Sequence, residues 1–249
     1  MSAFVLRLMA CVAMLIDHIG YAYGITLFRI IGRIAFPVFL FLIYNGYKHT
    51  ACKWKYALRL LVFAIISQIP FSLFVKDTLY TNNGNVFVTL LVCLLCFWSS
   101  DWMKQQKLLK WFCLLPWVLV FGLYFFGVIH SDYGAKAVLM ALSLFLFYGD
   151  KLWQRILLVL ATAGSVFYRF GIGCAAALKN FLFGQIFVLP TLSQWELLQV
   201  CSLLAFLLIF AYNGKKGWQI QSKPVAKLVQ YGFYLFYPVH ILILWLIER

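Results

Sequence analysis

Long apolar stretches alternate with short polar segments along the whole chain. The apolar stretches lie at about residues 3–24, 28–47, 56–74, 86–99, 108–128, 134–147, 151–168, 195–212 and 228–246. Most of them approach the roughly 20 residues that an α-helix needs to cross the hydrocarbon core of a bilayer. The pattern predicts an all-α, polytopic integral membrane helical bundle with about 9–10 transmembrane helices.

The segment at residues 169–194 does not fit the pattern. Polar, glycine and proline residues interrupt it at Gly171, Gly173, Lys179, Asn180 and Pro190. A re-entrant or interfacial segment would leave nine spans, because irregular backbone is tolerated at membrane depth only where protein or a cavity covers it. If the segment spans, the count is ten and the basic loop after it lies outside, against the charge rule. We favour nine spans plus a broken segment.

The composition confirms the membrane class. The chain is 65% hydrophobic and 11% charged, whereas soluble domains have roughly 45–50% apolar and 25% charged residues. The length suits a single domain over residues 1–249. The first apolar stretch lacks a small-residue cleavage site, so we expect no cleavable signal peptide.

The distribution of charge indicates the partners of the chain and its orientation in the membrane. The formal net charge is +14, which in a soluble protein would indicate nucleic acid. Here the cations lie in short loops, where they follow the positive-inside rule. The strongest cluster, Lys48, His49, Lys53 and Lys55, follows the second apolar stretch. We therefore expect the lipid bilayer rather than nucleic acid as a partner, and a cytoplasmic amino terminus.

The cysteines give no sign of a metal site. Most of them fall inside apolar runs, and Cys93-x-x-Cys96 has no histidine nearby in the sequence. A free cysteine in such a run is usually a small buried residue. We expect no metal.

The first apolar stretch carries ionisable side chains at Arg7, Asp17 and His18. Such groups are expensive in hydrocarbon, so an intramembrane Asp–His pair is a functional-site hypothesis by default. Arg7 and His18 are eleven positions apart, which places them on one helix face about 16 Å apart. Asp17 points about a quarter-turn away, toward another neighbour.

Two further residues, Arg33 and His240, are predicted at the depth of His18 and Asp17. The first two helices form a hairpin that turns near residues 25–26, so Arg33 returns to the level of His18 and can form an ion pair with Asp17. The last helix, if it runs outward, brings His240 to a similar depth, with Tyr237 one turn earlier. Purely structural readings stay open: His18 and His240 as hydrogen-bonded packing residues, Arg7 as a positive-inside flank.

Several motifs carry a family resemblance. The Arg7-x10-His18 spacing resembles the signature of the acyltransferase type 3 family of membrane enzymes. The chain as a whole resembles the TraX family, on motifs that cover nearly its full length: MLIDHIG, RIIGRIAFPVFLFLIYNGYKHT, RLLVFAIISQIPF, GNVFVTLLVCLL, HSDYGAKAVLM, AYNGKKG and FYLFYPVHILILWLI.

The resemblance implies a membrane-bound acetyltransferase of the bacterial inner membrane. It takes acetyl from cytoplasmic acetyl-CoA and passes it to an acceptor reached from the opposite side. TraX proteins suggest a peptide amine as acceptor, and the wider family a glycan hydroxyl; the residues do not decide between them. A histidine suits the role of base, and an arginine can stabilise the thioester oxygen as it becomes negative.

The implied roles divide into three groups. The catalytic candidates are His18, Asp17 and Arg33. The donor-binding candidates are Arg7, Lys48, Lys55 and Arg59, although Lys55-x3-Arg59 departs from the Arg-x-x-Arg motif of the type 3 family. The acceptor-side candidates are His240, Tyr237 and Asp132. The run His130-Ser131-Asp132 holds the residue types of a catalytic triad, but consecutive residues cannot form its geometry.

Two other functions remain open. A transporter or channel would use the Asp17, His18, Arg33 and His240 cluster for substrate passage and would consume no thioester. A non-catalytic scaffold of a secretion or conjugation system would tolerate replacement of His18 and Arg7.

Overall fold

The computed structural model describes residues 1–183, 186, 189–217 and 222–249. Within these ranges the regular structure is helical, apart from one isolated β-bridge between Gly84 and Ser131. The elements are α1 (Ala3–Ala22), α2 (Thr26–Gly32), α3 (Ala35–His49), α4 (Lys53–Lys76), α5 (Val86–Gln105), η1 (Lys110–Phe112), α6 (Leu115–Phe125), α7 (Gly134–Phe147), α8 (Leu152–Leu182), α9 (Gln194–Val200), η2 (Cys201–Leu204), α10 (Ala205–Phe210) and α11 (Lys223–Glu248).

The helices are long and apolar enough for a multi-pass membrane protein. In the described part of the chain six are of spanning length, with α2 and α3 counted together, and three shorter apolar helices lie at Lys110–Phe125, Gly134–Phe147 and Glu196–Phe210. Large apolar side chains cover the outside; on α4, for example, Ile65 is 67% exposed while the neighbouring Ala64 is buried. Such a surface fits contact with lipid, and the predicted all-α membrane bundle is confirmed.

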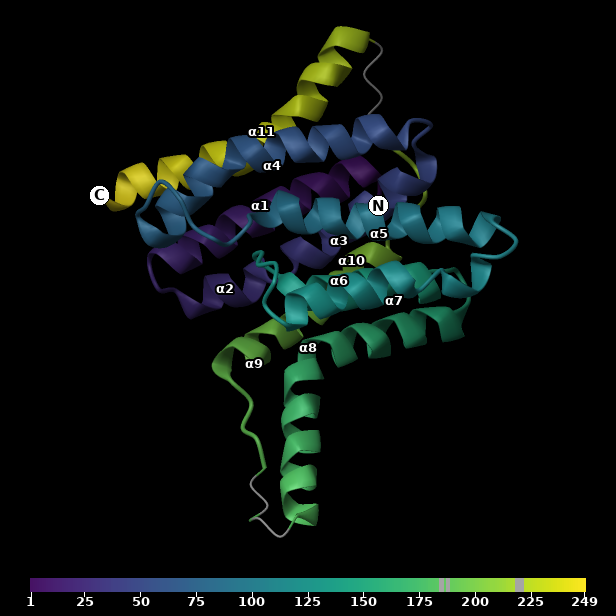
Figure 1. The fold of residues 1–249 in the computed structure, drawn as a ribbon. Helices are drawn as coiled ribbons and strands as arrows, with labels where there is room; N and C mark the ends of the chain where they lie inside the picture. Colours follow the sequence, from purple (N-terminus) through teal and green to yellow (C-terminus); the bar gives the residue numbers. More distant parts are fainter. Residues whose placement is uncertain (184–185, 187–188, 218–221) are drawn as a thin grey trace.

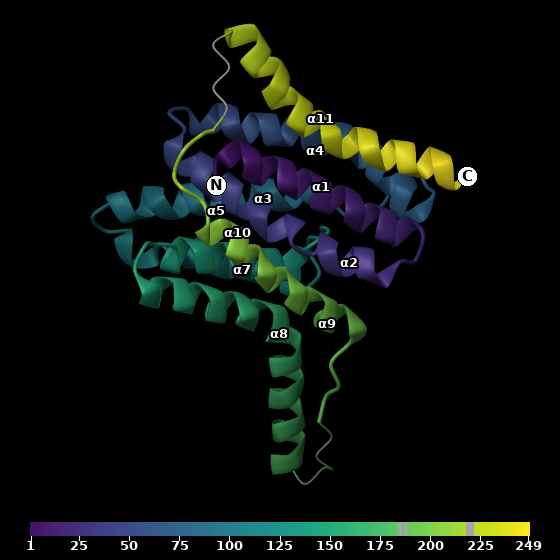
Figure 2. The same cartoon turned by 180° about the vertical axis from the view of Figure 1, so that it is seen from behind.

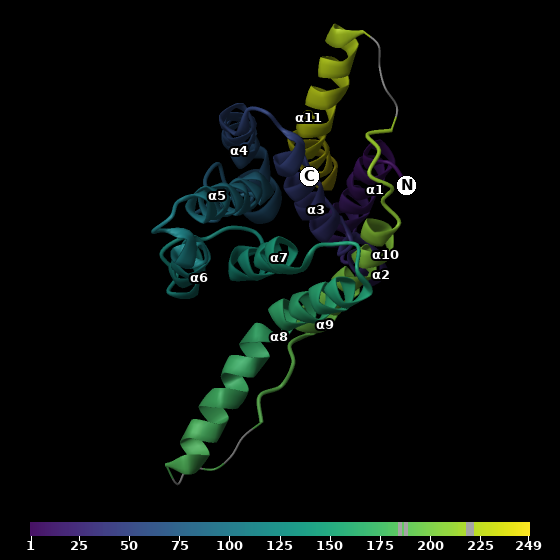
Figure 3. The same cartoon turned by 90° about the vertical axis from the view of Figure 1, so that its right-hand side faces the viewer.

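Helix α3 lies at the centre of the bundle. It contacts α1, α5, α7 and α10, and the end-on view of Figure 3 shows these helices around it. Most of its side chains are buried, among them Phe36, Phe41 and Tyr47. Helix α1 packs against α2, α3 and α11, and Figure 2 shows α1 and α11 side by side. The residues of α1 that the sequence singles out therefore face protein on several sides.

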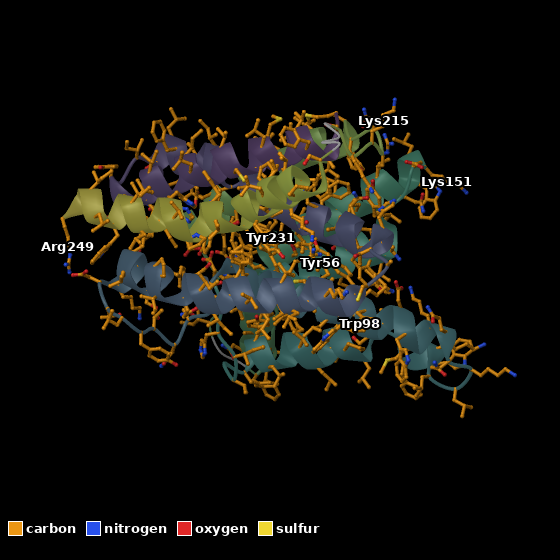
Figure 4. The ribbon with its side chains drawn as sticks, turned by 90° about the horizontal axis from the view of Figure 1, so that it is seen from above. Tyr56, Trp98, Lys151, Lys215, Tyr231 and Arg249 are labelled. Atoms are coloured by element: carbon orange, nitrogen blue, oxygen red, sulfur yellow. The ribbon has the colours of Figure 1, made fainter. Side chains whose placement is uncertain are left out.

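The two chain ends lie at opposite ends of the bundle (Figure 1). The amino terminus is held at one end, where Ala3 N donates to the carbonyl of Lys215 over 2.9 Å. Lys151 and Lys215 lie at this end, and Arg249 lies at the other (Figure 4). We call the first the basic end. An odd number of membrane crossings would place the two termini in this way.

Helix α8 differs from the prediction. We expected a helix to end near residue 168, but α8 continues through Gly171 and Gly173 to Leu182. Ser165, next to Gly164, donates its hydroxyl to the carbonyl of Thr162 over 2.6 Å, a contact that bends helices. Figure 1 shows α8 changing direction part-way, its second half extending away from the bundle. Residues 184–185 and 187–188 lie outside the described residues, so the re-entrant character of 169–194 stays a prediction.

Two loops at the end opposite the basic end are joined by the isolated bridge. Gly84 N donates to the carbonyl of His130 over 3.0 Å, and Asp132 N donates to the carbonyl of Gly84 over 2.9 Å. Asn85 caps α5 and donates its side-chain amide to Ala64 on α4 over 2.7 Å. These contacts hold the loop that carries Asp132 against the amino-terminal end of α5.

Candidate functional site

A buried carboxylate on α1 is held by two arginines. Arg33 donates from Nε to Asp17 Oδ1 over 3.1 Å and from Nη2 to Oδ2, and Arg29 donates from Nη1 to Oδ2 over 2.7 Å. Asp17 and Arg33 are only 7% and 6% exposed. The predicted Asp17–Arg33 ion pair is present. Arg29 was missed, although its position four residues before Arg33 places both on one helix face.

A glycine allows this cluster to form. A Cβ atom at Gly32 of α2 would overlap the Cβ of Asp17 and lie 2.5 Å from its Cα. Helix α2 therefore approaches α1 more closely than any other residue at this position would allow. The close approach brings Arg29 and Arg33 to Asp17 on either side of Gly32.

Two histidines form a hydrogen-bonded pair between α1 and α11. His18 Nδ1 and His240 Nε2 are 2.7 Å apart, and His240 Nδ1 lies 2.6 Å from the carbonyl oxygen of Phe236. A carbonyl only accepts, so Nδ1 of His240 carries the proton and Nε2 of the neutral ring accepts from His18 Nδ1–H. In this tautomer the lone pair of His18 lies on Nε2. No hydrogen bond to that nitrogen is present in the described part of the chain.

His18 lines a cavity of about 280 Å³. Its wall also contains Asp17, Arg29, Arg33, Asp132 and Tyr237, but not His240. His240 is 6% exposed and lies behind His18. The wall of the cavity therefore carries both acidic and basic side chains together with the imidazole of His18.

The loop carboxyl of Asp132 faces this cavity. Although the residue is exposed by its accessible surface, the protein around its carboxyl displaces water and raises its pKa from 3.8 to about 6; Arg33 and Arg29 act in the opposite direction. Asp132 therefore changes charge closer to neutral pH than an ordinary aspartate does.

Two more cavities follow toward the basic end. A cavity of about 100 Å³ shares Met14, Phe39, Val86 and Tyr237 with the His18 cavity. A third, of about 320 Å³, shares Arg7, Leu42 and Gln230 with the second and is also lined by His49 and Lys216. The three adjoin in series, and Arg7 lies where the second meets the third.

The predicted donor-binding residues separate into two pairs. Arg7 lies over the Phe233 ring at 5.1 Å and Arg59 over the Tyr56 ring at 5.5 Å, and neither forms an ion pair with a described residue. The Nε of Arg59 is buried without a hydrogen-bond partner among the described residues. Lys48 instead pairs with Asp101 over 3.2 Å. Neither Lys48 nor the exposed Lys55 lines the three cavities.

The predicted acceptor-side residues also differ in position. Tyr237 lines both the His18 cavity and the middle cavity, with its ring 6.0 Å from the His18 ring. Asp132 lines the His18 cavity, whereas His240 reaches it only through His18. Sequence reasoning missed His49, Lys216, Tyr133 and Gln199 as cavity residues; of these, only His49 and Lys216 lie in basic motifs that gave a signal.

Metal ligands are not gathered at this site. Among the residues that the structure describes, no group of three His, Cys, Asp or Glu side chains is placed to hold an ion. Cys93 and Cys96 are buried in α5. That the protein needs no metal stays a prediction.

Comparison with known proteins identifies the family. The sequence profile of the TraX protein family matches residues 2–248. The chain is 30% identical to the probable fimbrial assembly protein FimC, serogroup H1, of Dichelobacter nodosus, over 98% of this chain and 94% of that protein. It is 44% identical to an uncharacterized protein of Rickettsia prowazekii over 31% of this chain and 30% of that protein. No solved structure matches the chain. The wider likeness to the acyltransferase type 3 family stays a prediction. With a profile match over nearly its whole length, this multi-pass membrane protein belongs to the TraX family.

Proposed function

We propose that the protein is a membrane-bound acetyltransferase. It moves an acetyl group from acetyl-CoA, which enters at the basic end, to an acceptor that reaches the His18 cavity from the opposite side. The observation that carries the proposal is the position of His18: it lines the cavity that ends a series beginning at Arg7, and its Nε2 has no hydrogen bond among the described residues. Membership of the TraX family supports the same reading.

The basic end suits the charged part of the donor. Arg7 and Lys216 line the cavity there together with His49, and arginine and lysine side chains bind phosphate groups. Arg7 and His18 are separated by about 16 Å along α1, a distance comparable with the pantetheine arm of coenzyme A. The phosphates would remain near Arg7 while the thioester reaches His18. Arg59, which also forms no ion pair with a described residue, adds positive charge beside the middle cavity.

The group transfer follows from the histidine. The acceptor's amine or hydroxyl attacks the thioester carbonyl carbon, forming the new C–N or C–O bond while the C–S bond breaks. His18 Nε2 takes the proton from the acceptor and gives it to the departing thiolate, so coenzyme A leaves as the free thiol. Arg33 uses two N–H donors on Asp17 and, with five in its guanidinium group, has others to stabilise the oxyanion. Asp17 holds both arginines in place.

The acceptor is proposed at the level of chemical class. TraX-family membership and the name of the Dichelobacter relative support a subunit of a pilus or related surface appendage, acetylated on an amine. A glycan hydroxyl is the alternative that the wider resemblance suggests. Asp132 and Tyr237 in the cavity wall would contact either acceptor. We place the protein in the bacterial inner membrane with the basic end and amino terminus in the cytoplasm, in keeping with the positive-inside rule.

The test is acetyl-CoA binding and coenzyme A release by the full chain in detergent. We expect the wild type to bind and slowly hydrolyse acetyl-CoA, and His18→Ala to bind it but release coenzyme A about a hundred- to ten-thousand-fold more slowly, as expected when a general base is lost. Arg7→Ala should lose binding. Arg249→Ala, which removes a cation at the other end of the bundle, is the matched control and should behave as wild type. Failure of the wild type to bind acetyl-CoA would overturn the proposal.

A second candidate is transport. The series of adjoining cavities between the two ends is the observation that favours it. A transporter would move substrate across proteoliposomes without consuming a thioester, and His18→Ala would abolish flux rather than coenzyme A release.

A third candidate is a non-catalytic assembly factor, favoured by the name of the Dichelobacter relative. In that case His18→Ala and Arg7→Ala would still support assembly of the appendage in a deletion strain.

A further inference from the structure

We infer that His240 is a positioning residue, which holds His18 in the one neutral tautomer that presents a free Nε2 to the cavity. The inference rests on the proposed function in one respect, that His18 acts as the base. It assigns His240 a different role from the acceptor contact predicted from the sequence.

Two hydrogen bonds in sequence fix the proton positions, first on His240 and then on His18. The carbonyl of Phe236 can only accept, so it fixes the proton of His240 on Nδ1, 2.6 Å away. The other nitrogen of His240 is then the acceptor for His18 Nδ1–H at 2.7 Å. Each proton position is determined by the preceding contact, starting from a backbone atom that cannot change its role.

The surroundings hold His240 in place. Its ring stacks on that of Phe236, one turn earlier on α11, with centroids 4.7 Å apart and the planes at 21°. The His18 and His240 rings are also nearly parallel, at 29° with centroids 4.9 Å apart. His240 is 6% exposed and is absent from the cavity wall. A group in this place acts on a bound acceptor only through His18.

The other tautomer of His18 would be inactive in the proposed reaction. With the proton on Nε2, that nitrogen would donate a hydrogen bond and could not take a proton from an acceptor. Nδ1 would then point its lone pair at the lone pair of His240 Nε2, which is unfavourable. His240 therefore selects the reactive form without touching the substrate.

Conservative variants separate this role from packing. The amide oxygen of glutamine at position 240 can reach the place of Nε2 and accept from His18. The shorter asparagine can reach only the place of Nδ1, so it keeps the contact with Phe236 and loses the one with His18. Leu244→Ala removes a buried side chain one turn further along α11 and serves as the control for packing.

The first readout is independent of catalysis. Nitrogen NMR of histidine-labelled full-length protein in detergent distinguishes a ring protonated on Nδ1 from one protonated on Nε2. We expect His18 in the Nδ1–H form in the wild type, His240→Gln and Leu244→Ala, and a mixture of tautomers in His240→Asn. An Nε2–H form of His18 in the wild type, or an unchanged spectrum in His240→Asn, would overturn the inference.

The second readout is kinetic. His240→Asn should lower kcat for coenzyme A release about tenfold, the equivalent of one lost hydrogen bond of about 1.4 kcal/mol, with KM for acetyl-CoA unchanged. His240→Gln should recover most of that loss. An equal loss in His240→Gln and His240→Asn would contradict positioning. If the wild type is inactive while the tautomers respond as expected, the proposed function fails and the positioning of His18 stands.

Discussion

At the scale of single residues, the site depends on one carboxylate. Asp17 accepts hydrogen bonds from both Arg29 and Arg33, so one negative charge offsets two positive ones, one buried and one partly buried. The pair with Arg33 could be predicted by counting back and forward from the hairpin turn, because depth follows from helix rise. The contact between His18 and His240 could be predicted only as a shared depth, because the rotation of each helix about its axis is set by packing.

Removal of the Asp17 charge should strongly destabilise the folded protein. In Asp17→Asn the buried guanidinium of Arg33 and the partly buried one of Arg29 lose the carboxylate to which they bind, and we expect a loss of about 3–5 kcal/mol of stability, typical of a broken buried ion pair. Thermal unfolding in detergent measures the change. Asp150→Asn is the control, since Asp150 pairs with Arg155 over 3.8 Å in a fully exposed position and exposed pairs contribute little. Equal unfolding temperatures for Asp17→Asn and Asp150→Asn would show that the cluster does not stabilise the fold.

The carboxyl of Asp132 predicts a pH dependence of stability. Its pKa is raised from 3.8 to about 6 by burial, with Asp17 adding to the rise and Arg33 and Arg29 opposing it. Between these pH values the unfolded chain has lost the proton and the folded chain keeps it, so this group makes the folded state less stable as pH rises from about 4 to 6. Asp132→Asn removes the effect. The unfolding temperature of the variant relative to wild type should therefore increase across that window, and a constant difference would contradict the raised pKa.

At the scale of elements, glycines in two helices have roles that the sequence alone does not reveal. Gly171 and Gly173 do not end α8, since each glycine costs about 1 kcal/mol in a helix, whereas an unpaired backbone group in apolar surroundings costs several. The two glycines are visible in the sequence, but the sequence does not show that ending the helix there would cost more free energy than continuing it. In α2, by contrast, Gly32 is essential: any side chain at this position would overlap α1. Neither role could be predicted from the glycine alone, because both depend on the neighbouring element.

Gly32→Ala should separate α1 from α2. The added Cβ would overlap Asp17, so α2 must move and the hydrogen bonds from Arg29 and Arg33 must lengthen. We expect a loss of stability comparable with that of Asp17→Asn, measured by thermal unfolding in detergent. Gly122→Ala is the matched control, because a Cβ there meets no atom within 4 Å and alanine favours the helix by up to about 1 kcal/mol. If Gly32→Ala unfolds at the wild-type temperature, the close approach of α2 to α1 is not required.

At the scale of the whole molecule, composition and periodicity were sufficient for the fold class, because the bilayer restricts the backbone to helices that satisfy their own hydrogen bonds. The nine apolar helices of the described chain, six long and three shorter, correspond to the nine stretches predicted, except that α8 extends beyond residue 168 to Leu182. The serial arrangement of cavities could not be predicted, because it depends on how α1, α3, α4 and α11 pack together. Lys48 and Lys55 show the same limit: both belong to the basic cluster, yet neither side chain turns toward the cavities.

The number of crossings determines on which side the carboxyl terminus lies. The two termini lie at opposite ends of the bundle, and the cations near Lys151 and Lys215 gather at the end that holds the amino terminus. Under the positive-inside rule, a reporter fused after Arg249 should therefore lie outside the cytoplasm. Alkaline phosphatase at that position should be active and green fluorescent protein dark, while the same reporters inserted at Lys215 should give the reverse. Fluorescence from both positions would mean that the chain crosses the membrane an even number of times. Both ends of α11 would then lie in the cytoplasm, and the His18 cavity would open to the same side as the donor.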